Sequence, residues 1–301
     1  MGRMPAVRTG TPRSAADRAV PLSAARLRAA LRGAAEPAVR ALWTDLRVVR
    51  ETGSTSSDVL ALARAGAPEG LVIAAETQTA GRGRQGRTWL SQPGASLTFS
   101  ALLRPRPVPP SARGWVPLLA GVAVASAVGE LTGIDVCLKW PNDVLIGERK
   151  LAGILAEQDG GADDAIVLGI GMNVLGAERH LSVPGATSLQ AHGAGQTDRT
   201  ALLAEILRQL ARWYLRWTGI GDGDPDVCGL RPEYLRLSST VGRPVRVELP
   251  GGRTLAGTAV GVDGTGRLRV DAGGHGAAAS ALGVDDAGLI AVSAGDVIHV
   301  R

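Results

Sequence analysis

The sequence is short of cysteine and aromatic residues. Its two cysteines, Cys137 and Cys228, form no disulfide framework and lack the spacing of metal ligands. This excludes disulfide-rich secreted domains and cysteine-based zinc modules, and no metal site is expected. We expect both cysteines to be small buried residues. Aromatic residues make up 3% of the 301 residues, hydrophobic residues 45% and charged residues 20%, the composition of a soluble globular protein.

Long apolar runs are also missing. None reaches the roughly 18 residues needed to span a bilayer. The nearest candidate, residues 115–129, is shorter, rich in Ala and Gly, and contains Pro117, so it predicts a buried helix. The N-terminal segment has arginines but no apolar stretch of the kind that signal peptides carry. We therefore expect a cytoplasmic protein without a membrane partner.

Lysine is nearly absent, because only Lys139 and Lys150 among the 33 basic residues are lysines. Guanidinium and ammonium groups are not interchangeable in a tight site. A lysine retained against this bias indicates a need for a compact charge on a flexible stem. The segment 139–150 is therefore a candidate functional region.

The net charge of +5 is unevenly distributed. Residues 1–50 contain ten arginines and three acidic residues, a charge of +7, so the remaining 251 residues carry −2. A basic N-terminal arm is compatible with nucleic-acid binding. It has no aromatic residue before Trp43, and residues 1–20 have the composition of a disordered segment, so a solvated tail is the simpler interpretation.

Apolar runs and turn residues predict a mixed α/β body. Helices are expected at 22–35, 55–66, 111–131, 199–217 and 233–237, and strands at 46–53, 70–76, 95–103, 136–140, 144–146, 153–158 and 166–174. The strands do not alternate regularly with helices, which favours antiparallel neighbours. From about Val241, short strands separated by glycine turns predict a small β-barrel, interrupted by an Ala/Gly-rich loop at 272–288.

The segment Thr79–Trp89, TAGRGRQGRTW, contains a G-x-G-x-x-G pattern and three arginines. A dinucleotide-binding turn needs a helix directly after the glycines, whereas Pro93, Gly94 and a strand follow here, so we reject that function. RNA-binding Gly-Arg segments are long, repeated and disordered, unlike a loop between two core strands. The loop suits an anion with several oxygens, such as a carboxylate with a phosphate chain. A solvated basic loop is the alternative.

Two further stretches contain residues suited to such a site. In 139–157, KWPNDVLIGERKLAGILAE, Pro141 breaks a strand before an amide and a carboxylate at a turn. Lys150 can stabilise charge developing on a phosphate or acyl oxygen, and Gly153 permits close approach of a ligand. In 169–174, GIGMNV, two glycines in a strand often mark backbone held against a ligand. Each feature also has an ordinary structural explanation, namely a turn, a surface lysine and a bulge.

Five stretches follow one another in a characteristic order: GSTSSD (53–58), QTAGRGRQGRTW (78–89), KWPNDV (139–144), KLAGIL (150–155) and GIGMNV (169–174). Together they closely resemble the biotin–protein ligases, or biotin–[acetyl-CoA-carboxylase] ligases. The similarity extends from about residue 46 to 301 and includes a C-terminal VSAGDVIHVR, typical of the family's SH3-like barrel. The resemblance implies an α+β fold. Its class II synthetase-like biotin/lipoate ligase catalytic domain has a mixed, mainly antiparallel sheet with flanking helices, and the barrel follows.

The resemblance divides the chain into three parts. Residues 1–45 are expected to form a basic, partly disordered arm, residues 46–238 the catalytic domain that binds biotin and ATP, and residues 239–301 the SH3-like domain. Some family members also carry an N-terminal winged-helix domain that binds DNA. The short segment before the ligase body leaves little room for one. We therefore expect a monofunctional ligase without specific DNA binding, as a monomer or weak homodimer.

The resemblance also implies a two-step reaction. The carboxylate of biotin attacks the α-phosphate of MgATP, which gives biotinyl-5′-AMP and pyrophosphate. The ε-amine of a lysine on the biotin carboxyl carrier protein domain of an acyl-CoA carboxylase then attacks the mixed anhydride and releases AMP. Fixed cations oppose the repulsion between carboxylate and triphosphate, and a closing loop protects the adenylate from water.

The family's site residues map onto matching positions of this chain. Biotin contacts are implied at Ser54, Thr55, Gln78, Gly81, Arg82, Gly83, Lys150 and Gly153. Nucleotide contacts are implied at Arg84, Arg87, Trp89, Asn142 and Asn173. Catalytic roles are implied for Lys150, which neutralises the carboxylate and α-phosphate, for Arg84, which holds phosphate, and for Asp143, which assists transfer to the amine. Gln85 stands where some relatives have a further arginine.

Two other functions remain open at this point. Lipoate–protein ligases and octanoyltransferases share the implied fold, although the K-W-P-N-D and G-R-G-R-x-G stretches favour biotin. A non-catalytic nucleic-acid-binding protein that uses the basic arm is less favoured. Deletion of residues 1–40 separates this last alternative from the ligase, which is expected to keep near-normal activity without them.

Overall fold

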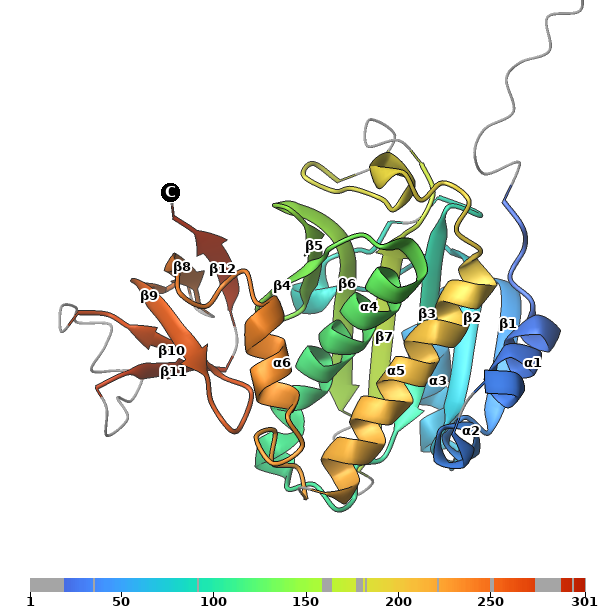
Figure 1. Cartoon of the computed structure of the whole chain (residues 1–301), viewed down its shortest axis with the longest axis horizontal. Helices are drawn as coiled ribbons and strands as arrows, with labels where there is room; N and C mark the ends of the chain where they lie inside the picture. The colour runs from blue at the N-terminus through green and yellow to red at the C-terminus, as the bar shows by residue number, and fades with distance from the viewer. Residues whose placement is uncertain are drawn as a thin grey trace, which may run out of the picture.

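A seven-stranded sheet in the order β1-β2-β3-β7-β6-β5-β4 forms the centre of the molecule (Figure 1). The computed structural model describes residues 19–34, 36–90, 92–158, 164–176, 181, 183–220, 222–249, 252–273, 288–293 and 295–300. The strands are β1 (Asp45–Thr52), β2 (Leu71–Gln78), β3 (Ser96–Leu103), β4 (Cys137–Lys139), β5 (Asp143–Ile146), β6 (Arg149–Gln158) and β7 (Ile166–Asn173). Among these strands β1 and β2 run parallel, and the other neighbouring pairs run antiparallel. The expected mixed, mainly antiparallel sheet is confirmed.

Helices cover both faces of this sheet. On one face α4 (Val116–Thr132) and α5 (Arg199–Gly219) pack against each other, and on the other α3 (Thr55–Arg64) packs on β2, β3 and β7. All eight residues of β3 are buried, because alternate side chains enter two different clusters. Phe99 belongs to the cluster beneath α4 and α5, and Leu102 to the cluster beneath α3. This explains why β3 is a continuous apolar run.

The most apolar helix is the centre of the core. Within the described residues, Pro110–Thr132 is long and apolar enough to cross a membrane by length and composition alone, and 67% of its apolar 18-residue segment is buried inside the fold. It consists of a short 3₁₀ turn, Pro110–Trp115, followed by α4. Helix α4 packs against α5, α6 and the strands β4, β5 and β6, and most of its residues are buried, as the sequence predicted.

The described part of the basic arm packs into the same core, unlike the solvated tail expected from its composition. It forms α1 (Ala24–Ala34) and α2 (Pro37–Leu42), which lie against α5. Leu27, Leu31 and Val39 are buried in the main cluster. The arginines of these two helices lie on their exposed faces. The excess of positive charge is therefore compatible with burial of the opposite faces. Residues 1–18, the larger part of the predicted disordered segment, lie outside the described residues.

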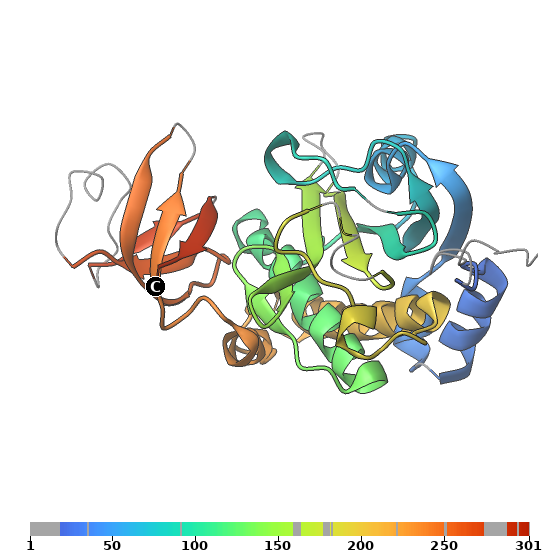
Figure 2. The same cartoon turned by 90° about the horizontal axis from the view of Figure 1, so that it is seen from above.

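A second, five-stranded antiparallel sheet follows at the C-terminal end, in the order β11-β10-β9-β8-β12 (Figure 2). Its strands are β8 (Pro244–Glu248), β9 (Thr254–Val262), β10 (Leu268–Asp271), β11 (Ile290–Val292) and β12 (Asp296–His299). Helix α6 (Leu230–Leu237) precedes it. Buried and exposed residues alternate along β8, as in a small β-barrel with one apolar face. Most of the predicted 272–288 loop lies outside the described residues.

Two tryptophans attach this C-terminal sheet to the domain that contains the seven-stranded sheet. Trp115 Nε1 donates to the Asp263 carbonyl and Trp140 Nε1 to the Gly266 carbonyl, each at 3.1 Å. Gly114 is required at this junction, because a Cβ there would lie 2.3 Å from the Thr265 oxygen. The turn that joins β9 to β10 is thus fixed against the start of α4.

Two local expectations need correction. The strand predicted to begin at Gly153 begins four residues earlier, so Lys150 lies within β6 and its backbone is part of the ladder with β5. Cys137 is only half-buried, whereas Cys228 is buried as expected. The cause at Cys137 is its place on β4, the edge strand of the sheet, where one side lacks a neighbouring strand among the described residues.

Candidate active site

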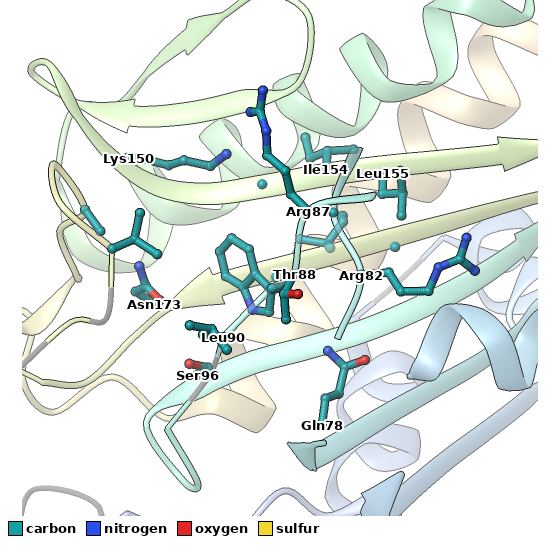
Figure 3. Close-up of a pocket in the computed structure, with 18 of the residues that line it drawn as sticks. Gln78, Arg82, Arg87, Thr88, Leu90, Ser96, Lys150, Ile154, Leu155 and Asn173 are labelled. Atoms are coloured by element: carbon teal, nitrogen blue, oxygen red, sulfur yellow. The ribbon is translucent and has the colours of Figure 1, made fainter. Parts of the chain in front are cut away.

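A cavity of about 340 Å³ opens beside the strands β2, β3, β6 and β7 (Figure 3). Most of the residues implied by the sequence line it: Ser54, Thr55, Gln78, Arg82, Gly83, Arg84, Arg87, Trp89, Asn142, Asp143, Lys150, Gly153 and Asn173. Gly81 does not line the cavity. It is packed within the loop, because a Cβ on Gly81 would come within 2.5 Å of the Trp89 carbonyl oxygen and 3.0 Å of Gln78 Nε2. The fold therefore gathers segments more than a hundred residues apart around one space.

Hydroxyl groups meet at the buried end of this cavity. Thr55 and Ser56 begin α3, and their hydroxyl oxygens lie 2.8 and 3.0 Å from the Ser100 hydroxyl on β3. Gln78, the last residue of β2, accepts from the backbone N–H of Thr55 at 2.8 Å. Ser54 is the N-cap residue of α3, but its side chain makes no capping hydrogen bond. The side chains that form these hydrogen bonds are polar and uncharged.

Three strand glycines form the floor of the cavity, and each accommodates a side chain. A Cβ on Gly171 would lie 2.4 Å from the Trp89 indole, and one on Gly153 3.2 Å from the same ring. A Cβ on Gly169 would lie 2.6 Å from the Ser56 hydroxyl. The glycines thus mark a close approach, as predicted, but the approaching groups are the protein's own side chains. The indole N–H of Trp89 is buried and has no hydrogen-bond partner among the described residues.

The loop between β2 and β3 folds back on itself above this floor. Gly83 N–H donates to the Arg87 carbonyl at 2.7 Å, and Trp89 N–H to the Gly81 carbonyl at 2.9 Å. Gln85 has a φ of 54° and Gly86 a φ of 73°, so the chain reverses direction through left-handed backbone. The resulting narrow hairpin presents its arginine side chains away from its own axis.

Each loop arginine contacts a different part of the protein. Arg82 pairs with Glu157 on β6 at 2.5 Å, and Arg87 pairs with Asp296 on β12. Arg84 Nη1 donates to Asn142 Oδ1 at 3.0 Å. Burial lowers the pKa of the Arg84 guanidinium, an effect that the Asp143 charge opposes. The sequence did not indicate Glu157 or Asp296, because acidic residues at strand ends are common on any surface.

Lys150 lies at the opposite side of the cavity from Gln78 and Arg82, near Asn173 (Figure 3). Its Nζ pairs with Asp143 Oδ1 at 2.5 Å, so the two candidate catalytic residues contact each other across neighbouring strands. The Lys150 backbone is held by Gly185 and Thr187, with N···O distances of 2.9 Å on both sides. Asn173 donates its amide to the Thr187 carbonyl at 3.1 Å, which holds the segment 183–187 beside the lysine.

The charge distribution is asymmetric along the cavity. Lys150, Arg84 and Arg87 gather near Asp143 and Asp296, whereas the hydroxyl end has no charged side chain in direct hydrogen bonding. Over the described residues, no group of three or more His, Cys, Asp or Glu side chains could hold a metal ion. The cavity therefore suits a ligand with a neutral hydrogen-bonding head and an anionic tail beside a further anion.

A second cavity of about 340 Å³ borders the first at Arg84, Asn142 and Ile154. Its other wall includes Trp140 and the turn 265–267 of the C-terminal sheet. Arg84 thus lines both spaces, and its guanidinium is held by Asn142 and by the Gly295 carbonyl.

Comparison with known proteins gives a consistent result. The Biotin/lipoate A/B protein ligase family matches residues 48–173, and the Biotin protein ligase C terminal domain matches residues 240–300. A biotin–[acetyl-CoA-carboxylase] ligase of Mycobacterium tuberculosis is 41% identical over 86% of this chain and 90% of that protein. A ligase of the same name from Paracoccus denitrificans is 33% identical over 73% and 92%. Biotin protein ligase from Aquifex aeolicus in complex with biotin and ATP has a TM-score of 0.68 at 27% identity, covering 86% of this chain and 99% of that one.

Proposed function

Because this chain belongs to the biotin protein ligase family and is an ATP-dependent ligase that attaches biotin to protein, we propose roles for the residues around its main cavity. The observation that supports them is one cavity with an uncharged hydrogen-bonding end and a cationic end. Biotin has a neutral ureido ring at one end and a carboxylate at the other. Its ring is assigned to the hydroxyl end, and its carboxylate points toward Lys150.

Ring recognition is assigned to Ser54, Thr55 and Gln78, whose hydroxyl and amide groups line the buried end. The backbone of Arg82 and Gly83 contributes from the loop, since the Arg82 side chain is engaged by Glu157. Gly81, which does not line the cavity, is assigned no contact with the ring. Gly153, which lines the cavity, is assigned to the apolar chain of biotin. An apolar wall next to a few oriented polar groups is the usual composition of a small-molecule site.

The first step joins two anions. A biotin carboxylate oxygen attacks the α-phosphorus of ATP, the bond from the α-phosphorus to its bridging oxygen breaks, and pyrophosphate leaves. Lys150 and Arg84 are assigned to the carboxylate and the phosphate oxygens, where fixed cations stabilise developing charge. Arg87, Trp89, Asn142 and Asn173 are assigned to the nucleotide. Mg²⁺ enters with ATP as part of the co-substrate.

The second step transfers the acyl group. The lysine amine of a biotin carboxyl carrier protein domain attacks the acyl carbon of biotinyl-5′-AMP, and AMP leaves with the bond electrons. The attacking amine must lose a proton, and Asp143 is assigned to accept it or to orient the amine. In the free chain this carboxylate is paired with Lys150, so the substrate anions compete with it for the lysine. A cytoplasmic location, and a monomer or weak homodimer without specific DNA binding, complete the proposal.

The experiment is biotin transfer by the purified chain to a carrier fragment, with and without MgATP, followed by mass spectrometry of the carrier. The expected result is one added biotinyl group that depends on ATP. ATP–pyrophosphate exchange in the presence of biotin, lipoate or octanoate tests the related activities of the same fold. Exchange supported by lipoate and not by biotin would overturn the assignment of the hydroxyl end to a ureido ring.

A further inference from the structure

A chain of hydrogen bonds joins four side chains at the buried end of the main cavity. Thr55 is central: its backbone N lies 2.8 Å from Gln78 Oε1, and its hydroxyl lies 3.0 Å from the same oxygen. The Thr55 hydroxyl also lies 2.8 Å from that of Ser100, which in turn lies 3.0 Å from that of Ser56. The three hydroxyl residues are 2%, 6% and 0% exposed for Thr55, Ser56 and Ser100. Water therefore cannot easily satisfy these groups, and their order matters.

The direction of every hydrogen in this chain follows from one backbone group. A backbone N–H can only donate, so the Gln78 carboxamide must turn its oxygen toward Thr55. That oxygen can only accept, so the Thr55 hydroxyl donates its single hydrogen to Gln78. With that hydrogen spent, Thr55 must accept from Ser100, and Ser100 must accept from Ser56. All the hydroxyl hydrogens point along the chain toward Gln78.

This order decides what the cavity offers to a ligand. Thr55, Ser56 and Gln78 line the cavity, whereas Ser100 lies behind them. Because the hydroxyl hydrogens are spent inside the chain, Thr55 and Ser56 offer only oxygen lone pairs to a bound molecule. Gln78 has its oxygen engaged and retains its amide nitrogen as the donor. The buried end is thus built to accept from N–H groups and to donate to a carbonyl.

We propose that Ser100 is a positioning residue that makes this end of the cavity specific for a cyclic urea. A ureido ring presents two N–H donors and one carbonyl acceptor, the complement of what the chain leaves free. A ring without N–H groups, such as a dithiolane, would leave the Thr55 and Ser56 oxygens buried and without donors, a penalty that gives strong discrimination. This inference rests on the assignment of biotin to this end of the cavity.

Removal of the Ser100 hydroxyl breaks the two central hydrogen bonds, those to Thr55 and Ser56. Ser56 loses its acceptor, so its hydrogen becomes free to point toward the ligand N–H groups and to oppose them. Thr55 loses a donor and is left with an unsatisfied buried lone pair. Ser100→Ala is expected to weaken biotin binding about 10- to 100-fold. The nucleotide end of the cavity does not contact this series of hydrogen bonds. The KM for ATP and kcat at saturating biotin are therefore expected to stay within a few fold of the parent values.

Thr98 provides a matched control. It lies two residues before Ser100 on the same face of β3, is 2% exposed, and donates its hydroxyl hydrogen to the Ala75 carbonyl at 3.1 Å, outside the chain. Thr98→Val removes a comparable buried hydrogen bond and is expected to lower stability without changing biotin affinity. Ser100→Cys keeps the side-chain shape with a weak donor and is expected to bind with intermediate affinity. If Ser100→Ala does not fold, the biotin affinity of Ser100→Cys is measured in its place.

The experiment is calorimetric titration of the full-length chain and its variants with biotin and with desthiobiotin, which keeps the ureido ring and lacks the sulfur. Support requires that Ser100→Ala loses the same factor for both ligands, and that this loss shrinks in a Ser56→Ala background. The proposal is overturned if Ser100→Ala binds biotin within twofold of the parent, or if Thr98→Val loses as much. Failure of the parent chain itself to bind biotin would instead refute the proposed function.

Discussion

Trp89 lies directly on Gly171, so closely that a Cβ on the glycine would come within 2.4 Å of the indole ring. Trp89 belongs to the loop between β2 and β3, and Gly171 to β7. On the neighbouring strand β6, a Cβ on Gly153 would lie 3.2 Å from the same ring. A loop side chain therefore reaches the floor of the main cavity only because two adjacent strands lack side chains there. The position of the loop is coupled to the floor through this single ring.

Gly171→Ala is expected to push the indole out of its place. Overpacking a closed contact costs about 1–3 kcal/mol, and here the loop can yield more easily than the sheet. We expect a moderate fall in Tm, a change in tryptophan fluorescence, and at least a tenfold loss of adenylation. Gly129→Ala is the control, because nothing lies within 4 Å of its Cβ and alanine is the better helix former. Unchanged fluorescence and activity in Gly171→Ala would contradict the close contact.

Lys150→Ala is expected to lower the rate of pyrophosphate release by about 10²-fold or more, the scale of losing one preorganised charge donor. Lys150→Arg is not expected to restore the rate, because the larger guanidinium does not fit the 2.5 Å contact with Asp143 in the same way. Lys139→Ala removes the other lysine, which does not line the cavity, and serves as the control. Wild-type pyrophosphate release in Lys150→Ala would remove this residue from the reaction.

Arg84→Ala is expected to lower adenylation to a similar extent, about 10²-fold or more. The variant loses a buried guanidinium between the two cavities as well as its bond to Asn142. Single-turnover formation of biotinyl-5′-AMP measures the effect without the transfer step. Arg253→Ala, an exposed arginine of the C-terminal sheet, controls for loss of one positive charge. Equal rates for these two variants would show that Arg84 acts only through net charge.

The loop is expected to open more readily when its contact with the C-terminal sheet is lost. Arg87 and Asp296 form a partly exposed pair, with 61% and 26% of their side chains accessible, so salt should weaken it. Asp296→Asn is expected to increase trypsin cleavage after the loop arginines in the free chain. Biotin with MgATP is expected to suppress cleavage in both proteins. Asp271→Asn is the control within the same sheet, and equal cleavage with and without ligands would exclude a closing loop.

Deletion of residues 1–40 now has a different expected outcome from the one that the sequence suggested. It removes Leu27, Leu31 and Val39 from the main core, and burial of each such side chain contributes about 1.5–3 kcal/mol. We expect a large fall in Tm and loss of activity through unfolding. Deletion of residues 1–18 keeps every described contact and is expected to preserve biotin transfer. Loss of transfer without loss of Tm in the shorter deletion would assign the first residues a direct role.

Much of the fold was predictable because its signals are local. Composition alone indicates how three elements are buried: β3 is a continuous apolar run, α4 is uniformly apolar and α5 is amphipathic. The prediction of a solvated basic arm was wrong for the same reason. Average charge describes the exposed faces of α1 and α2, whereas their four buried side chains, Leu27, Leu31, Val39 and Leu42, are a minority of the segment.

The site was predictable to the extent that its residues occur in characteristic stretches. Lys150, Asp143 and the loop arginines could be named before their contacts were known. Ser100 could not, because a single serine within SLTFSALL has no local signal that separates a buried bond from an ordinary strand position. Its importance arises from Thr55 and Gln78, which lie 45 and 22 residues away in the chain and are linked to it by the packing of α3 on β3.

The sequence by itself determined the chemistry that the cavity holds: a cationic loop, one lysine, and the hydroxyls that begin α3. Only the tertiary structure decided the partners of these groups, since Arg82, Arg84 and Arg87 pair with Glu157, Asn142 and Asp296 on three separate elements. The physical reason is that charge and hydrogen-bonding capacity belong to the residue, whereas distance and the direction of a hydroxyl hydrogen belong to the fold. The GxGxxG pattern is a further example. Its residues are visible in the sequence, but only the fold shows that they form the turn of a hairpin whose Trp89 lies on Gly171.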